Sequence, residues 1–294
     1  MSIKNQDSSF VLVLISWLLC LGSYILILKS NKMTILDKII ASKYNEVEIQ
    51  KKLMPVSILQ KKEDFNRPTI SLKASLTKSG STGIIAEFKR KSPSKGVIND
   101  NVRVEDVTYS YAEAGAAGLS VLTDRNFFGG SLVDLFAARL TNTVPILRKD
   151  FMVDEYQIIE AKAYGADVIL LIAACLELKQ IQHLTDCAKS LGLEVLLEIH
   201  ALEELGKVID GVDIVGVNNR NLKDFKVDLQ HSVELSHKIP GSFIRISESG
   251  IDHPDTINYL RSQGFQGFLI GENFMKQPDP GKACEEFIKQ LKIN

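Results

Sequence analysis

The fold is decided by residues 145–172, PILRKDFMVDEYQIIEAKAYGADVILLI. Both ends of this stretch, 146–148 and 168–172, are short and apolar, as strands buried on both faces of a sheet should be. Between them, 154–164 has a helical pattern that leads to Gly165, and glycine suits the left-handed position after the end of a helix. The stretch therefore predicts a strand, a helix and a second buried strand in succession.

The same alternation continues along the chain on both sides of this stretch. Strands are predicted at 83–88, 119–122, 146–148, 168–172, 194–198, 214–218, 243–247 and 267–270, and further helices at 104–114, 177–191, 229–237 and 255–263, the last directly after Pro254. Eight strand–helix pairs in roughly 210 residues match the size of an α/β fold, the (β/α)8 TIM barrel. A doubly wound sheet is the alternative, but the turn after the first strand, EFKRKSPSKG, lacks the GxGxxG fingerprint of that fold.

Two segments precede the predicted barrel. Residues 35–53 have the pattern of an amphipathic helix, which is expected either to cap the floor of the barrel or to fold over its mouth. Residues 10–28 are apolar throughout, and as a helix they would extend about 28 Å, close to the thickness of the hydrocarbon core of a bilayer. Because Met33 opens a well-formed sequence, 1–32 is expected to be either a membrane anchor or a mis-set start before a catalytic domain at 33–294.

The composition excludes several classes of protein. With 45% hydrophobic, 24% charged and 7% aromatic residues, the chain is neither a collagen, nor disordered, nor a disulfide scaffold. The 35 basic and 36 acidic residues give a net charge of −1 and no global attraction to nucleic acid. Four cysteines without CxxC spacing predict neither a zinc site nor a disulfide framework. The five histidines fall mostly on predicted helices or loops, and we expect them to be structural.

Charged side chains gather at the carboxyl ends of the predicted strands. Glu87 and Lys89 end the first strand two residues apart, and therefore on the same face. Lys149 follows the third strand and Glu198 ends the fifth, and in a barrel these strand ends converge on one mouth. A lysine ammonium can protonate or polarise a carbonyl oxygen, and a carboxylate can take up a proton. This pairing suits carbonyl addition, decarboxylation or dehydration.

The ends of the last two strands indicate a phosphate site. ISESGI (246–251) and FLIGENF (268–274) place glycines directly after these strands. Glycine lets the backbone approach an anion, and N–H groups at the start of a short helix can hold a phosphate. The predicted cradle consists of Ser249, Gly250, Gly271, Glu272 and Asn273. Glu272 is unusual beside a phosphate, so its backbone is expected to bind while its side chain points away.

Six segments together carry a family resemblance. They are IIAEFKRKSPSKG (84–96), SVLTDRNFFGGS (120–131), residues 145–172 as quoted above, LEVLLEIH (193–200), VGVNNRNL (215–222) and ISESGI (246–251). From about residue 35 onward the chain closely resembles indole-3-glycerol-phosphate synthase, the tryptophan-pathway enzyme that closes the indole ring. The resemblance implies that 1-(2-carboxyphenylamino)-1-deoxyribulose 5-phosphate is converted to indole-3-glycerol phosphate, carbon dioxide and water without a cofactor or metal.

The resemblance also implies roles for individual residues. Lys149 would be the general acid that polarises the ketone, Glu198 the catalytic carboxylate, and Glu87 with Lys89 a second catalytic pair. Substrate contacts are implied at Ser92, Phe128, Phe151, Leu170, Asn218, Glu248 and Ser249, and the two phenylalanines and the leucine among them would form the apolar pocket for the anthranilate ring. Which lysine and which carboxylate serve each proton transfer stays open.

Two other functions are weighed against this one. The first is another phosphate-binding barrel enzyme of the same pathway, and the second is a non-catalytic barrel tethered to a membrane as a scaffold. Since only one barrel is predicted, we expect a monofunctional enzyme. We also expect it to be a monomer, with its catalytic domain in the cytoplasm. Its expected partner is a small phosphorylated substrate and no nucleic acid, and a membrane is contacted only if residues 10–28 are translated and retained.

Overall fold

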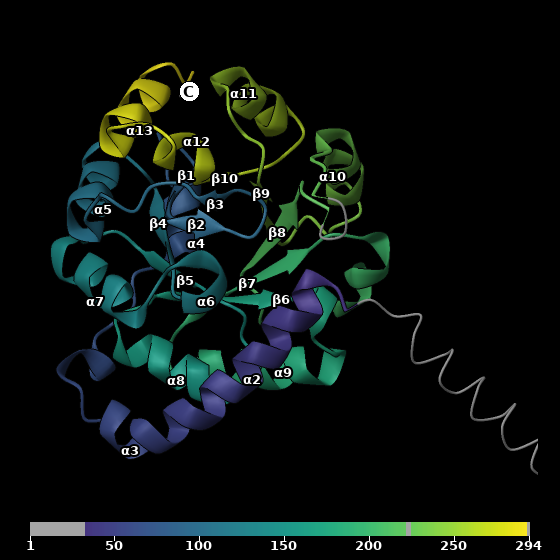
Figure 1. The fold of residues 1–294 in the computed structure, drawn as a ribbon. Coiled ribbons are helices and arrows are strands. Elements are labelled where there is room, and N and C mark those ends of the chain that lie inside the picture. The colour runs from purple at the N-terminus through teal and green to yellow at the C-terminus, as the bar shows by residue number, and fades with distance from the viewer. Residues whose placement is uncertain (1–32, 222–224, 293–294) are drawn as a thin grey trace, which may run out of the picture. The chain divides into compact units, whose positions relative to one another are not determined.

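A computed structural model describes residues 33–221 and 225–292 and divides them into two units, one up to residue 38 and another from residue 39 onward. In the second unit, eight parallel strands close into a barrel (Figure 1). The strands are β1 Ile84–Phe88, β4 Gly118–Leu122, β5 Ile146–Lys149, β6 Val168–Ile172, β7 Glu194–Ile199, β8 Ile214–Asn218, β9 Ile244–Glu248 and β10 Gly267–Ile270. The predicted TIM barrel is confirmed, and the strands differ from the prediction only at their ends.

Helices surround the barrel and follow most of its strands (Figure 1). They are α4 Leu72–Thr77, α5 Val104–Glu113, α6 Arg125–Phe128, α7 Leu132–Thr141, α8 Glu155–Ala163, α9 Leu178–Ser190, α10 Leu229–Ser236, α11 Pro254–Ser262, α12 Glu272–Met275 and α13 Pro280–Lys289, after α2 Ile35–Leu53 and α3 Val56–Leu59. The short 3-10 helices are η1 Glu63–Asn66, η2 Ala173–Cys175 and η3 Leu202–Lys207, and β2 Lys91–Ser92 pairs with β3 Gly96–Val97 in a hairpin after β1. Between β7 and β8, η3 takes the place of a full helix.

The helix ends follow from their local sequences. Asp154 and Gln157 form a capping box at the start of α8, and Gly165 adopts the predicted left-handed conformation after its end, with φ of 86°. Pro254 is the first residue of α11 rather than the residue before it, and the side chain of His253 caps the helix. The ring of Pro254 is tolerated there because the first N–H of a helix has no partner within the helix.

Alternate residues of each strand face opposite sides of the barrel wall. On β1, Ile84, Ala86 and Phe88 pack outward in the large core under the helices, whereas Ile85 points into the barrel. The interior core continues with Leu147, Leu170, Leu196 and Ile246 from other strands. Leu72 and Leu76 of α4 belong to this interior core, so α4 closes the floor of the barrel.

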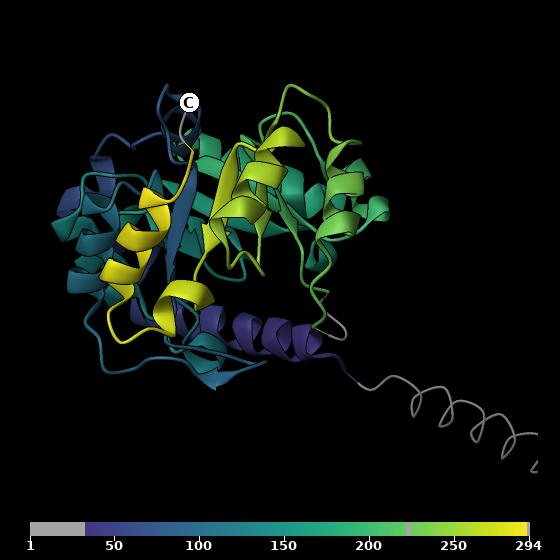
Figure 2. The same ribbon diagram turned by 90° about the horizontal axis from the view of Figure 1, so that it is seen from above.

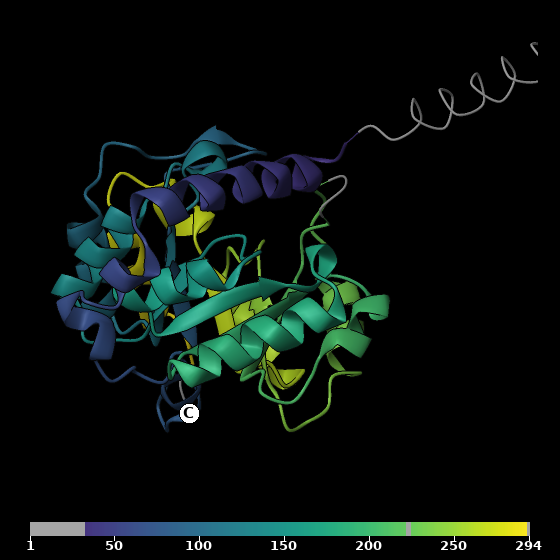
Figure 3. The same ribbon diagram turned by 90° about the horizontal axis from the view of Figure 1, so that it is seen from below.

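Residues 39–53 of α2 lie over the mouth and not under the floor. Figures 2 and 3 show this part of α2 on the same side of the barrel as the hairpin β2–β3 and α6. The ammonium of Lys43 lies 3.1 Å from a carboxylate oxygen of Asp124 after β4 and 2.9 Å from one of Asp150 after β5. Burial disfavours the charge of Lys43, but Asp150, Asp124 and Glu46 raise its pKa above its usual value. Lys43 thus attaches the helix to two loops at the mouth.

Among the described helices, none is both long and apolar enough to cross a membrane. The apolar segment at 10–28 lies outside the described residues.

The charge of Lys43 can be tested by Lys43→Met. We expect the free energy of unfolding to fall by about 3 kcal/mol, because two buried carboxylates lose their shared cation. Lys51→Met on the same helix is the matched control, since Lys51 is partly exposed in its pair with Asp154 and should contribute at most about 1 kcal/mol. Urea denaturation of both variants measures the difference, and equal midpoints would contradict the role of Lys43.

Candidate active site

The inward-facing positions of the strands become polar at the mouth. On β1, the next inward-facing residue after Ile85 is Glu87. In the same way, Leu196 is followed by Glu198 on β7, and Ile246 by Glu248 on β9. The site residues predicted from the sequence lie at the carboxyl ends of the strands or in the loops and short helices that follow, except Leu170, which lies within β6. Closure of the barrel therefore brings residues from distant parts of the chain to one place.

Lys149 lies between two carboxylates at the centre of this mouth. Its ammonium is 2.8 Å from Oε2 of Glu198 and 3.1 Å from Oε2 of Glu248. The exposed fractions of the side chains are 13% for Lys149, 4% for Glu198 and 2% for Glu248, so the three charges interact with little water between them. One cation thus faces two acids, and the two acids repel each other when both are ionised.

The surroundings shift the pKa values of Glu198 and Glu248 in opposite directions. Burial raises the pKa of Glu198, but the charge of Lys149 and the close contact with His200 outweigh it and hold that pKa well below its usual range. Burial raises the pKa of Glu248 to about 7, with Lys149 opposing the rise and Glu198 adding to it. Burial disfavours the ammonium of Lys149, yet Glu198 and Glu248 raise its pKa above the usual value. Glu198 is therefore an ionised carboxylate, and Glu248 holds a proton up to about neutral pH.

Glu87 and Lys89 form a second ion pair at the mouth. The ammonium of Lys89 lies 2.7 Å from Oε1 of Glu87, and the hydroxyl of Ser120 donates to Oε2 at 3.3 Å. A Cβ atom at position 271 would lie only 2.6 Å from Oε1 of Glu87. Gly271 therefore makes room for the carboxylate of Glu87, a reason for this glycine that is separate from phosphate binding.

The turn after β9 has the backbone geometry of an anion site. Ser249 and Gly250 are successive residues in the left-handed region, with φ of 71° and 70°. The side chain of Asn219 donates to the carbonyl oxygen of Ser249 at 2.7 Å and holds the turn. A non-glycine residue in this region is uncommon and is often found at functional sites, and successive backbone N–H groups in a tight turn can bind an anion.

The carboxylate of Glu272 faces cations of neighbouring loops. It lies 3.6 Å from the ammonium of Lys95 and 3.5 Å from the guanidinium of Arg220. Asn273 donates through its side chain to the carbonyl oxygen of Asp252 at 3.2 Å. The side chain of Glu272 thus holds together two cations that stand close to the predicted phosphate cradle.

Aromatic side chains line the side of the mouth next to β5 and β6. The rings of Phe128 on α6 and Phe151 after β5 lie with their centroids 5.9 Å apart. Phe151 packs against the interior core that contains Leu170. Ser92 lies apart from this group on β2, where its hydroxyl is 3.4 Å from that of Ser94.

Asn218 and His200 complete the surroundings of Glu198. The side chain of Asn218 donates to Oε1 of Glu198 at 3.0 Å, and Nε2 of His200 lies 3.1 Å from the same oxygen. Within the described part of the chain, no group of three or more His, Cys, Asp and Glu side chains has the arrangement of a metal site.

Comparisons with known proteins agree with one another. The family model described as indole-3-glycerol phosphate synthase matches residues 36–287. The chain belongs to the indole-3-glycerol phosphate synthase family. It is 49% identical to the synthase of Bacteroides thetaiotaomicron, with 87% of this chain and 98% of the relative covered, and 44% identical to that of a Polaromonas species, with 86% and 97% covered.

Solved structures with low sequence identity show the same fold. A mutant tryptophan synthase α-subunit of Pyrococcus furiosus aligns with a TM-score of 0.56 at 13% identity, covering 72% of this chain and 98% of that one. A 3-hexulose-6-phosphate synthase aligns with a TM-score of 0.56 at 13% identity, covering 71% and 100%. The family assignment makes the chain a carboxy-lyase of tryptophan biosynthesis, and neither a scaffold nor another enzyme of the pathway is favoured.

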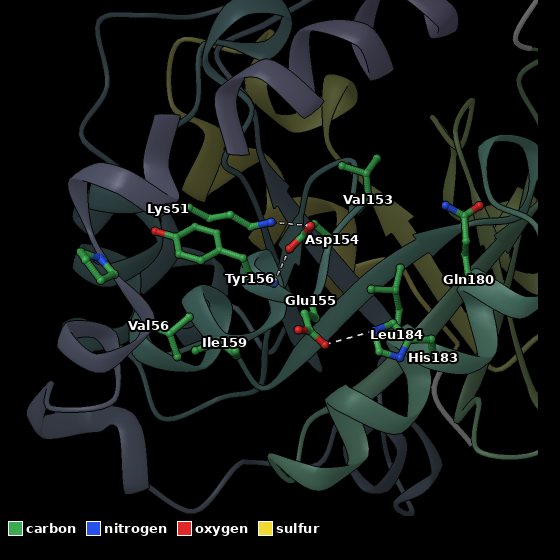
Figure 4. A pocket seen from close by; sticks show the side chains of 11 residues that line it. Lys51, Val56, Val153, Asp154, Glu155, Tyr156, Ile159, Gln180, His183 and Leu184 are labelled. Carbon is green, nitrogen blue, oxygen red and sulfur yellow. Dashed lines mark hydrogen bonds and ion pairs between the residues drawn. The ribbon is translucent and has the colours of Figure 1, made fainter. Parts of the chain in front are cut away.

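In this synthase fold, a cavity of about 440 Å³ lies beside the N-terminal parts of α8 and α9, between them and the end of α2 with α3 (Figure 4). It is lined by residues of α2, α3, α8 and α9 and the segments next to them. An ion pair joins Lys51 to Asp154 at 2.8 Å, and Nε2 of His183 lies 3.1 Å from a carboxylate oxygen of Glu155. The cavity shares no residue with the charged cluster at the strand ends.

Two polar residues at these strand ends, His200 and Arg220, were not among the predicted site residues. His200 was expected to be structural, although it follows Glu198 by two residues and so continues the inward face of β7. Arg220 follows Asn218 by the same interval, and its backbone N–H donates to Oδ1 of Asn218 at 3.0 Å. The two-residue spacing that identified Glu87 and Lys89 would also have pointed to both.

The protonation of Glu248 can be tested by Glu248→Gln. Because its pKa of about 7 in the folded protein lies above the usual 4.5, its contribution to stability is fully present below about pH 4.5 and is lost as pH rises through about 7. Glutamine has no such dependence. We therefore expect the variant to gain about 1 to 3 kcal/mol relative to wild type between about pH 5 and about pH 8, measured by urea denaturation. Glu203→Gln controls for removal of an exposed carboxylate, and a constant difference for Glu248→Gln would contradict its raised pKa.

Proposed function

We propose that the mouth of the barrel closes the indole ring of 1-(2-carboxyphenylamino)-1-deoxyribulose 5-phosphate, with loss of carbon dioxide and water, to give indole-3-glycerol phosphate. The observation that carries this proposal is the Lys149 ammonium held between Glu198 and Glu248, because it places an acid and a base within reach of one reacting carbon skeleton. Family membership supplies the reaction, and the residue roles below are our assignments.

The substrate is oriented by its two ends. The phosphate binds at the left-handed turn of Ser249 and Gly250 and at the backbone of Gly271, Glu272 and Asn273, where N–H groups can surround an anion. The anthranilate ring lies beside Phe128, Phe151 and Leu170. Ser92, Asn218 and Glu248 contact the polar part between the two ends, so the ketone comes to the ammonium of Lys149.

Ring closure needs a proton donor at the ketone oxygen. The aromatic carbon that carries the carboxylate attacks the ketone carbon, and negative charge develops on the ketone oxygen. Lys149 stabilises this charge and delivers a proton, since its surroundings keep it an ammonium at neutral pH. The carboxylate then leaves as carbon dioxide, and its bonding electrons restore the aromatic ring.

Dehydration needs a second acid and a base. The hydroxyl formed from the ketone leaves as water when it receives a proton, and a proton leaves the methylene carbon next to the nitrogen. Glu198 takes up that proton, because its pKa is held well below the usual range and it is ionised at neutral pH, against burial, mainly by Lys149. Lys89, fixed by Glu87 at 2.7 Å, is the second ammonium at the mouth and protonates the leaving hydroxyl.

The role of Lys149 is tested by Lys149→Ala in an assay that follows indole-glycerol fluorescence. Loss of a positioned acid should lower kcat by roughly 10²- to 10⁴-fold. Lys189→Ala is the matched control, because Lys189 forms a partly exposed pair with Asp213 away from the mouth. A near-wild-type rate for Lys149→Ala would remove this lysine from the mechanism, and no product from folded wild-type protein would remove the proposed reaction.

We also propose that the catalytic domain acts as a monomer in the cytoplasm and does not need residues 1–32. The family match begins at residue 36, and the Bacteroides relative is covered over 98% of its length by 87% of this chain. A protein that starts at Met33 should therefore keep the kcat and KM of the full chain. A fall in kcat of more than about tenfold would contradict this independence.

Fractionation of untagged native protein, with mass-spectrometric mapping of its N-terminus, tests whether 10–28 ties the domain to a membrane.

A further inference from the structure

His200 contacts the carboxylate that the proposed mechanism uses as its base. Its Nε2 lies 3.1 Å from Oε1 of Glu198, and the exposed fractions of the two side chains are 9% and 4%. The contact is on the oxygen that Lys149 does not hold, since the ammonium of Lys149 is nearest to Oε2. Glu198 is therefore held from both of its oxygens.

The backbone and ring of His200 are held on the side away from Glu198. Its backbone N–H donates to Oε2 of Glu204 at 2.7 Å, and the same oxygen lies 4.0 Å from Nδ1 of the ring. Its carbonyl oxygen lies 3.2 Å from Nε2 of His231. Among the described residues, neither ring nitrogen has a partner with hydrogen-bond geometry, but Nε2 lies within ion-pair distance of the carboxylate of Glu198. The ring stands between two carboxylates, in a place that favours an imidazolium.

The charges around this ring come from several elements. Burial lowers the pKa of His200, but Glu198 on β7, Glu204 on η3 and Glu248 on β9 outweigh it and raise that pKa above 6.5. The other titratable groups around the pair are Lys149 on β5, Cys175 on η2 and His231 on α10. Lys149 is the one cation among them in direct contact with Glu198, and it must also serve Glu248 and the substrate.

Glu248 and the substrate compete with Glu198 for the ammonium of Lys149, and His200 can compensate Glu198 for the loss of that contact. When the ammonium turns toward the ketone, Glu198 loses part of the positive charge that keeps it ionised, while His200 stays in contact with the other oxygen. We infer that His200, as an imidazolium, is a positioning residue that holds Oε1 of Glu198 and keeps this carboxylate ready to accept the substrate proton during the reaction. The inference rests on the proposed role of Glu198 as the base.

The kinetic test compares His200→Ala with His200→Gln. We expect the alanine variant to lose about tenfold to hundredfold in kcat near pH 7 with little change in KM, because a charge-assisted contact to the base is lost and no substrate contact is removed. The acidic limb of its kcat profile should move to higher pH, since Glu198 then ionises less readily. Glutamine places a neutral amide N–H near the position of Nε2 and should recover part of kcat. His183→Ala controls for loss of a histidine–glutamate contact of the same 3.1 Å on the surface.

Three results would overturn the inference. They are a wild-type kcat and acidic limb in His200→Ala, equal losses in both His200 variants with an unmoved acidic limb, and a neutral His200 in the folded wild type near pH 7. The last is read from the ring ¹⁵N shifts of labelled protein, and it does not depend on the folding of any His200 variant. We expect the imidazolium in wild type and its loss in Glu198→Gln.

Glu198→Gln also separates this inference from the proposed mechanism. If Glu198→Gln keeps the wild-type kcat, Glu198 is not the base, and the inferred role of His200 is wrong as well. If it is inactive while His200→Ala is unchanged, only the inference about His200 is wrong.

Discussion

The ammonium of Lys149 allows two carboxylates to be buried next to each other at the mouth of the barrel. Without that shared cation, Glu198 and Glu248 would both be disfavoured as ions by burial and by each other. With Lys149 present, the two carboxyl groups differ in protonation: Glu198 stays ionised, whereas Glu248 holds a proton to about pH 7. A site that must deliver and accept protons in one reaction depends on such a difference between neighbouring groups.

Strand periodicity made most of this site predictable from the sequence. A strand buried on both faces alternates between the interior and the helices, so the inward positions after Ile85 and Leu196 had to be Glu87 and Glu198 once the strands were located. The same rule also places His200 on the inward side of the barrel, although it was expected to be structural because the histidines fall mostly on predicted helices or loops. The proposed apolar pocket for the anthranilate ring is different, since Phe128 and Phe151 come together only in the folded chain and were predicted from the family resemblance.

The position of α2 could not be predicted from its own pattern. An amphipathic helix shows that one face is buried, but the pattern does not tell which end of the barrel covers it. The position of α2 over the mouth depends on Lys43, whose partners Asp124 and Asp150 are far away in sequence. The floor is instead closed by α4, a helix too short to stand out as a periodic pattern, through Leu72 and Leu76.

Three consecutive charges at the end of β5 connect the helix over the mouth to Lys149 and its two carboxylates. Lys149 faces the interior, whereas Arg148 and Asp150 pair with each other at 3.1 Å on the other side of the wall. Burial raises the pKa of Asp150, but Lys43 and Arg148 outweigh it and hold that pKa at about 2, so this carboxylate is charged at neutral pH. The backbone on both sides of Lys149 is thus fixed by ion pairs outside the mouth. The ammonium of Lys149 therefore lies between Glu198 and Glu248 on a backbone that is held in place, and the proposed acid catalysis requires such rigidity.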